Sequence, residues 1–322
     1  KFILIFLKKK TILLFCKGML MGTADLIPGI SGGTIALITG IYKDLLASID
    51  SLNYKNLSLI KGGNLKKLWE SINGDFLVTI FSGIIISILA FSYLIDWLIK
   101  NQPIQLWSFF FGVLVTSIFF LKKLVFNWNF YSTIFLIIGI LISYQLTSLP
   151  LKADDTTLLY LFFCGIMGSI AMILPGISGA YIFLILGVYQ TLLNSIKMIT
   201  KVWSSFNWDI FTETFLILSV TGLGFIIGLR IFASILKNLI EKYNDKTMPL
   251  LIGLMIGSLQ KIWPWQEIVN INLNNEKYLY SKAILPSTYE GNPEILTSLI
   301  VMITAILLTI FLGSKNLTLK ND

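Results

Sequence analysis

Histidine is absent from this 322-residue chain, and cysteine occurs only twice. Without an imidazole, the chain lacks the commonest general base and metal ligand of enzymes that work near neutral pH. Cys16 and Cys164 both lie in apolar segments, so they indicate neither a disulfide framework nor a metal site. The sequence therefore predicts no catalytic residue, no metal and no cofactor.

Charged residues are also scarce, at 13% of the chain, whereas hydrophobic residues reach 55%. Soluble domains contain about 25% charged residues, and the mean hydropathy here is +0.80. Several apolar segments reach the ~20 residues that a helix needs to cross a bilayer. This composition predicts an all-α, polytopic membrane protein. Its net charge of +8 indicates basic cytoplasmic loops and no binding to nucleic acid.

Ten apolar segments follow one another along the chain. We expect membrane helices at Thr11–Ile27, Ser31–Ile49, Phe76–Ile99, Ile104–Leu121, Tyr131–Leu149, Thr157–Leu174, Ser178–Ile196, Phe211–Leu236, Met248–Trp263 and Glu294–Leu312. Two polar stretches interrupt the series. Asp50–Asp75 is expected to form a loop with an amphipathic surface helix, and Trp265–Pro293 to form a second long loop.

A Pro/Gly motif occurs twice, as "PGISGG" at Pro28–Gly33 and as "PGISGA" at Pro175–Ala180. A shift of 147 residues (175 − 28) aligns 22 residues from each motif onward, and 14 of them are identical. Further along, the alignment matches Phe76, Leu77 and Gly83 with Phe215, Leu216 and Gly222 at a shift of 139, and "FFFGVLVTSI" with "LLIGLMIGSL". We therefore expect one integral membrane domain of two structural repeats, residues 1–150 and 151–322. Each repeat has a Pro/Gly-broken hairpin followed by three transmembrane helices.

The distribution of Lys and Arg distinguishes two topologies. If each broken segment is a re-entrant hairpin, the second repeat is inverted and 18 of the 25 basic residues lie on the cytoplasmic side. If each broken segment crosses once, the split is 13 against 12. Cytoplasmic loops are enriched in Lys and Arg, so we expect inverted repeats with re-entrant hairpins and both termini in the cytoplasm. Hairpins whose two legs cross fully give the same count, which leaves their depth open.

Each motif places a turn before a new helix inside membrane-grade sequence, where irregular backbone needs polar partners. Inverted-repeat transporters bind substrate near the midplane between their repeats, and the free N–H groups at a helix start favour anions. We expect the two tips to converge on a phosphate site formed by Gly29, Ser31, Gly32, Gly33, Thr34, Gly176, Ser178 and Gly179. In the alternative interpretation, proline and glycine only permit tight hairpins and close packing, and each serine caps its own helix.

Charged residues within apolar sequence are further candidates. Asp25 lies three residues before the first proline, where a carboxylate suggests coupling to a proton or ion, or else a helix cap. Arg230 is a candidate phosphate ligand, although its long side chain also suits the cytoplasmic interface. Lys261 lies near a predicted helix end and is expected at the interface.

Three stretches together resemble one family: "KGMLMGTADLIPGISGGTIALITGIY", "AMILPGISGAYIFLILGVY" and "GLMIGSLQKIWPW". In this order they resemble the bacterial polyprenyl-phosphate translocases of the PopT type, formerly a domain of unknown function. The resemblance covers nearly the whole chain. It implies a plasma-membrane protein that returns undecaprenyl phosphate, the lipid carrier of cell-wall synthesis, from the outer to the inner leaflet. The second motif differs at Met172, Ala180 and Tyr181, so the roles of the first motif do not transfer to it.

The residues agree with that substrate class, because an anionic headgroup needs a polar path across the bilayer while its tail stays in lipid. Moving one negative charge inward against the membrane potential costs about 2.3 kcal/mol per 100 mV. Proton uptake at Asp25 would offset this cost. One alternative is a membrane-embedded undecaprenyl-pyrophosphate phosphatase with a Pro-Gly-x-Ser-Arg-Ser motif, whose arginine is replaced here by Gly32. A transporter of a small soluble anion and a membrane scaffold are the others.

Overall fold

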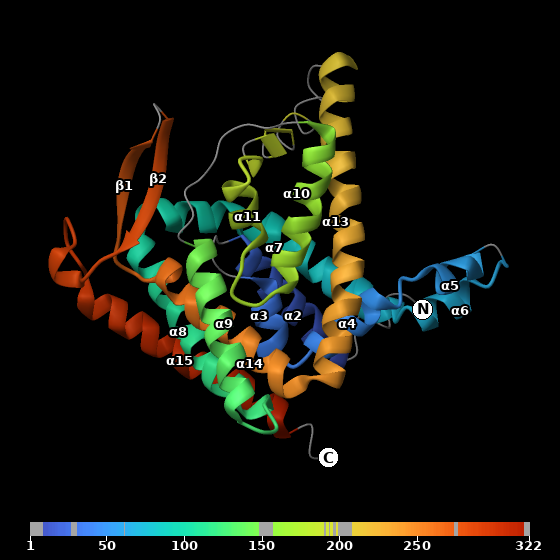
Figure 1. Cartoon of the computed structure of the whole chain (residues 1–322), viewed down its shortest axis with the longest axis horizontal. Helices are drawn as coiled ribbons and strands as arrows, with labels where there is room; N and C mark the ends of the chain where they lie inside the picture. The colour runs from blue at the N-terminus through green and yellow to red at the C-terminus, as the bar shows by residue number, and fades with distance from the viewer. Residues whose placement is uncertain are drawn as a thin grey trace.

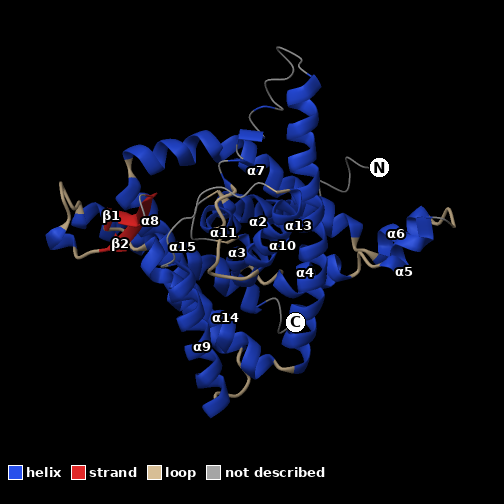
Figure 2. Ribbon diagram, turned by 45° about the horizontal axis from the view of Figure 1, so that its top comes forward, coloured by secondary structure: helices blue, strands red, loops and turns tan. Residues whose placement is uncertain are grey.

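Helices form most of the chain, and a single pair of β-strands lies at one edge of the described structure (Figures 1 and 2). The computed structural model describes residues 9–26, 31–60, 62–147, 157–189, 191–192, 194–195, 198, 208–273 and 276–318. The α-helices are α2 (Lys9–Asp25), α3 (Gly32–Ile38), α4 (Tyr42–Asp50), α5 (Tyr54–Leu57), α6 (Leu65–Ser71), α7 (Gly74–Asn101), α8 (Pro103–Leu121), α9 (Phe130–Thr147), α10 (Leu158–Ile173), α11 (Gly179–Ile185), α13 (Trp208–Lys242), α14 (Asn244–Ser258) and α15 (Ile295–Thr318). Short 3₁₀ turns are η1 (Ser58–Ile60), η2 (Lys122–Leu124), η3 (Leu259–Ile262) and η4 (Pro286–Thr288).

Within the described residues, α7, α8, α9 and α13 are long and apolar enough to cross a membrane. The shorter apolar helices α10 and α15 accompany them. Their outer faces expose large hydrophobic side chains, such as Leu89 on α7 (70% exposed) and Leu296 on α15 (74% exposed). Exposed apolar surface on this scale suits lipid and not water. The prediction of a multi-pass helical membrane protein is confirmed.

Two sequence predictions about the regions between helices need correction. The stretch Trp265–Pro293 is not only a loop, because β1 (Gln266–Leu273) and β2 (Glu276–Ala283) pair antiparallel, with Gln266 opposite Ala283. β1 contains Ile268, Val269 and Ile271 and β2 contains Tyr278 and Tyr280, residue types that favour extended backbone. The description "all-α" therefore does not fit the whole chain. The helices expected at Ser31–Ile49 and Ser178–Ile196 are each broken a second time, at Gly40 (φ +73°) and Gly187 (φ +74°).

The polar stretch Asp50–Asp75 does form short helices, α5 and α6, which project from the side opposite the β-hairpin (Figure 1).

Glycines let the first helix of each hairpin approach a long neighbour. Helix α2 packs on α7, where a Cβ atom added to Gly18 or Gly83 would overlap the backbone of the other helix. Helix α10 packs on α13 in the same way, through Gly165 and Gly224. Close backbone approach at small residues is the usual means by which membrane helices associate.

Two further pairs join the rest of the bundle. Helix α8 packs on α15, with Gly112 against the Met302 carbonyl, and α14 packs on α9, with Gly253 against the Leu136 carbonyl. Among the four helix pairs lie α3 and the loop before α11 (Figure 1), and α4 packs on α13. The buried core includes Ala36, Leu46 and Ile177 of the two hairpin segments together with Leu251 and Met255 of α14, all at most 4% exposed.

Candidate functional site

The two Pro/Gly motifs meet inside the bundle. The Ser31 hydroxyl donates to the Met172 carbonyl (2.7 Å), and the Gly176 N–H donates to the Thr34 hydroxyl (3.0 Å). The expectation that the hairpin tips converge is confirmed. Pro28 and Gly29 of the first motif lie outside the described residues.

Backbone lies against backbone where the tips touch. A Cβ atom at Gly33 would overlap the carbonyl oxygen of Ile173, and the Met172 carbonyl oxygen would be only 3.1 Å away. The same Ile173 carbonyl accepts a hydrogen bond from the buried Tyr42 hydroxyl (3.0 Å). Only glycine therefore fits at position 33 without moving one tip. The corresponding position in the second motif is the half-buried Ala180.

The donors at the start of α3 already have acceptors within the protein. The Gly32 N–H donates to Asp25 Oδ1 (2.6 Å), and the Gly33 N–H donates to the Ser31 hydroxyl (3.0 Å). Asp25, at the end of α2, thus places its carboxylate where an external anion would bind. Its other oxygen, Oδ2, is buried and has no hydrogen-bond partner in the part of the chain that the structure describes. Ser31 caps its own helix, as the alternative interpretation of the motif expects.

The second tip differs from the first. Gly176 has φ +83° and contacts the backbone of Leu254 and Met255 on α14, where a Cβ atom would come within 2.9 Å of both. Ser178 is the N-cap residue of α11 but accepts no capping hydrogen bond through its side chain. Gly179 faces the Gly168 carbonyl of α10, which lies 3.0 Å from where a Cβ atom would be. The second motif therefore has no counterpart of Asp25 and a serine that is not used as a cap.

At the C-terminal ends of α3 and α11, backbone carbonyl groups accept hydrogen bonds from side chains that were not among the predicted site residues. Lys17 donates through Nζ to the Thr39 carbonyl (2.6 Å), and the Tyr160 hydroxyl donates to the Leu186 carbonyl (2.8 Å). Thr39 and Leu186 are 147 residues apart, the shift that aligns the two motifs. The repeat alignment could have indicated that these two carbonyls are equivalent. It could not have identified their donors, because Lys17 and Tyr160 are not aligned with each other and are different residue types.

The two basic residues considered in the sequence analysis, Lys261 and Arg230, lie in different parts of the structure. Lys261, expected at the interface, is half-buried, and its Nζ lies 4.7 Å above the ring of Tyr181 on α11. Arg230 is exposed on α13, where its charge acts on Asp50. Asp50 also forms an ion pair with Lys237 (2.9 Å). Among the described residues, no hydrogen bond or ion pair joins Arg230 to either tip, whereas Lys261 lies against Tyr181 of the second hairpin.

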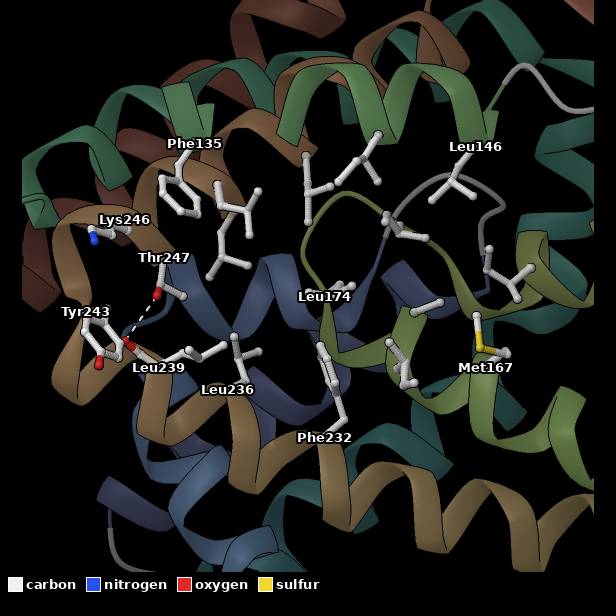
Figure 3. Close-up of a pocket in the computed structure, with 18 residues that line it drawn as sticks. Phe135, Leu146, Met167, Leu174, Phe232, Leu236, Leu239, Tyr243, Lys246 and Thr247 are labelled. Carbon is white, nitrogen blue, oxygen red and sulfur yellow. Dashed lines mark hydrogen bonds between the residues drawn. The ribbon is translucent and has the colours of Figure 1, made fainter. Parts of the chain in front are cut away.

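An apolar cavity of about 610 Å³ lies beside the second tip, between α9, α10, α13 and α14 (Figure 3). In the close-up, Tyr243, Lys246 and Thr247 lie at one end, and Leu146 and Met167 at the other. Leu174, next to the second proline, lies between the two ends. This cavity was not predictable from the sequence, because its lining comes from α9, α10, α13 and α14 together with Ile182 of α11 and the turn before it.

Comparison with known proteins assigns the chain. Residues 21–279 match the model of the VCA0040-like family, described as undecaprenyl phosphate translocase-like. The chain belongs to this family. It is 37% identical over 303 residues to the polyprenyl-phosphate transporter of Vibrio cholerae serotype O1, covering 92% of this chain and 94% of that protein.

A second relative is more distant. The chain is 31% identical over 260 residues to the polyprenyl-phosphate transporter of Staphylococcus aureus, covering 77% of this chain and 84% of that protein. No solved structure matches. The family match contains both hairpin tips, Lys246 and Lys261, and the names of the family and of both relatives describe transporters rather than enzymes.

Proposed function

We propose that this protein is a transporter that returns undecaprenyl phosphate from the outer to the inner leaflet of the bacterial plasma membrane. The observation that carries the proposal is the contact between two Pro/Gly tips, one from each half of the chain, in a member of the undecaprenyl phosphate translocase-like family. Irregular backbone within a bundle of membrane helices has polar groups to offer a headgroup. Recycling of the carrier in this way would supply cell-wall polymer synthesis.

Two inverted repeats are part of the proposal, and the helix contacts support them. Gly22 on α2 packs against Ser87 on α7, and Ser169 on α10 packs against Gly228 on α13. The two contacts correspond to each other, because Ser169 is 147 residues after Gly22 (169 − 22) and Gly228 is 141 residues after Ser87 (228 − 87). In the first repeat the earlier helix carries the glycine, and in the second repeat it carries the serine. A coincidence of this kind is hard to obtain without a common repeat, and three crossings per repeat would invert the second one.

The same contacts correct the alignment of the later helices. The sequence alignment matched Gly83 with Gly222 at a shift of 139, but Gly222 has no atom within 4 Å of a Cβ placed on it. Gly83 packs on the Phe15 carbonyl of α2, and Gly224 packs on the Phe162 carbonyl of α10. These carbonyls are 147 residues apart, so Gly224 is the counterpart of Gly83.

The proposed orientation places both termini in the cytoplasm. The α8–α9 and α13–α14 connections meet at one end of the bundle, because the N–H groups of Phe126 and Asn127 donate to Asp245 Oδ1 (2.9 and 3.2 Å). Lys122 and Lys123 lie in the first connection, and Lys242 at the end of α13 and Lys246 in the first turn of α14 lie on either side of the second. An end this rich in lysine favours the cytoplasm.

We further propose that Asp25 couples transport to protons. Its carboxylate competes with phosphate for the Gly32 N–H, which it holds at 2.6 Å. A neutral carboxyl group is a weaker acceptor than a carboxylate, so protonation releases the start of α3 for phosphate at Ser31, Gly32, Gly33 and Thr34. The second tip receives phosphate at Gly176, Ser178 and Gly179, and Gly29 and Arg230 remain predicted ligands. Uptake of a proton with the phosphate removes the cost of about 2.3 kcal/mol per 100 mV for inward movement of one negative charge.

Competition binding tests the proposed substrate. Purified protein in detergent should bind labelled undecaprenyl phosphate, and unlabelled undecaprenyl phosphate should displace it while a large excess of inorganic phosphate should not. Displacement by inorganic phosphate at similar concentrations would instead indicate a transporter of a soluble anion. Release of phosphate from undecaprenyl pyrophosphate by the purified protein would indicate the phosphatase.

A further inference from the structure

The apolar cavity between α9, α10, α13 and α14, here called the lateral cavity, is built like a binding site for a chain with a charged end. Its volume of about 610 Å³ falls within the roughly 300–1,000 Å³ of typical ligand sites. Along α9 the lining runs from Phe135 to Leu146, and 11 residues (146 − 135) rise about 16 Å in a helix. The cavity is therefore long enough for a stretch of extended hydrocarbon.

The lateral cavity reaches the outer surface of the bundle. Several of its lining side chains are also exposed: Ile142 by 44%, Met167 by 48% and Tyr243 by 54%. They come from α9, from α10 and from the α13–α14 junction. Because this surface faces lipid, the opening admits a chain from the side, without passage through water.

One end of the lateral cavity is cationic. The Nζ of Lys246 lies 5.6 Å from the ring centre of Tyr131 and 5.7 Å from that of Tyr243. No carboxylate of the described residues lies within the 4.0 Å of an ion pair with it. The neighbouring Asp245 carboxylate instead accepts the N–H groups of Phe126 and Asn127. The Thr247 hydroxyl donates to the Leu239 carbonyl (3.1 Å; Figure 3), so Lys246 is the group at this end with a charge to offer a ligand.

We propose that the lateral cavity is a release site on the Lys246 side of the membrane, next to the second tip and distinct from the phosphate site proposed between the two tips. The first isoprenoid units of a polyprenyl phosphate lie along the apolar lining, and the phosphate binds Lys246. This inference rests on the proposed function, which supplies a ligand with one apolar chain and one anionic head. Charge complementarity at one end and an apolar lining elsewhere match that ligand and do not match a free anion.

The position of the lateral cavity gives the release site a mechanical link to the tips. Its lining includes Leu174 and Ile177, which flank the Pro175–Gly176 turn, and Leu254. Gly176 in turn contacts the Leu254 carbonyl, with 2.9 Å to a Cβ placed on the glycine. A chain in the cavity thus touches the residues on either side of the second tip, which links the release site to the tips.

Binding of short prenyl phosphates to the purified full-length protein tests this site. Farnesyl phosphate, farnesol and inorganic phosphate are measured as separate ligands, with an anionic phospholipid as competitor. Lys246→Ala should weaken farnesyl phosphate binding about tenfold, since a charge-assisted contact is lost, and leave farnesol binding unchanged. Lys246→Arg should restore most of the affinity for farnesyl phosphate.

Bulky side chains in the cavity provide the second arm. Ile142→Trp on α9 and Met167→Trp on α10 should each weaken farnesyl phosphate and farnesol binding by at least tenfold. The matched controls are Leu141→Trp, which lies next to Ile142 but faces outward with 60% exposure, and Lys242→Ala, an exposed lysine outside the cavity lining. Both controls should bind within about twofold of wild type.

Each result decides the proposal. Wild-type affinity in Lys246→Ala and in both tryptophan variants would overturn it, and so would equal displacement by inorganic phosphate or by the anionic phospholipid. If farnesyl phosphate binding depends on Ser31 but not on Lys246 or the cavity, the release site fails and the proposed function stands. If the wild-type protein binds no prenyl phosphate, the proposed function fails and the release site fails with it.

Discussion

Replacement of Gly33 by alanine tests the contact between the hairpin tips. The added Cβ would overlap the carbonyl oxygen of Ile173, which is backbone and cannot rotate away. Alanine gains about 1 kcal/mol over glycine in helix propensity, but overpacking a tight site costs about 1–3 kcal/mol. Separation of the tips also weakens the Ser31–Met172 and Gly176–Thr34 hydrogen bonds, each worth about 0.5–1.5 kcal/mol.

The balance predicts that Gly33→Ala destabilises the protein by about 2 kcal/mol. Thermal unfolding of the purified protein in detergent, monitored by tryptophan fluorescence, measures this loss of stability. Translocation in vesicles measures the effect on transport. Gly222→Ala is the matched control, because nothing lies within 4 Å of its Cβ, and it should melt at or above the wild-type temperature. If Gly33→Ala melts and transports like wild type, the tips are not held together as described.

Three further predictions concern the same core and its topology. Asp25→Asn keeps an acceptor for the Gly32 N–H, so it should fold normally but lose the acceleration of transport by an inward proton gradient; an unchanged response would remove Asp25 from coupling. Ser31→Ala leaves two buried groups without partners and should lower stability by about 1–3 kcal/mol, whereas Ser178→Ala should cost less, and equal melting temperatures would contradict this asymmetry. In a cysteine-free background, Lys66→Cys should react with maleimide only from the cytoplasm and Lys282→Cys only from outside, and reaction of both from one side would overturn the inverted topology.

Much of the architecture was predictable because it depends on the pattern of apolar residues and on repetition. The helix boundaries follow the apolar segments, and the shared shift of 147 residues identified two hairpins whose tips do converge. The β-hairpin at Gln266–Ala283 was missed because a polar stretch between membrane helices resembles a loop until its strands pair. The breaks at Gly40 and Gly187 were visible as repeated glycines, but their positive φ values belong to the folded backbone.

The candidate site was predictable in composition but not in geometry. The sequence identified Asp25, Ser31 and Gly33 as candidates, but it did not show that the Asp25 carboxylate accepts the Gly32 N–H at the start of α3. The sequence also did not show that Lys261, predicted at the interface, is half-buried with its Nζ over the ring of Tyr181 from the second hairpin. This hydrogen bond and this ring contact depend on how the folded chain brings the residues together, so they cannot be predicted from the residue types alone.

The lateral cavity was also not predictable from the sequence, because it depends on contacts between helices that are far apart in the chain. Its lining residues are ordinary membrane apolar residues, and Lys246 looks like any basic residue in a cytoplasmic loop. Only the packing of α9 and α14 against α10 and α13 brings a cation to the end of an apolar channel.

Translocation in reconstituted vesicles tests the central claim most directly. A fluorescent polyprenyl phosphate is placed in both leaflets, and a membrane-impermeant quencher reports the fraction accessible from outside over time. Wild-type protein should make nearly all of the lipid accessible, Gly33→Ala should do so much more slowly, and Gly222→Ala should match wild type. Accessibility that changes no faster than in protein-free vesicles, while the same preparation carries inorganic phosphate, would contradict the claim that this protein moves a lipid phosphate.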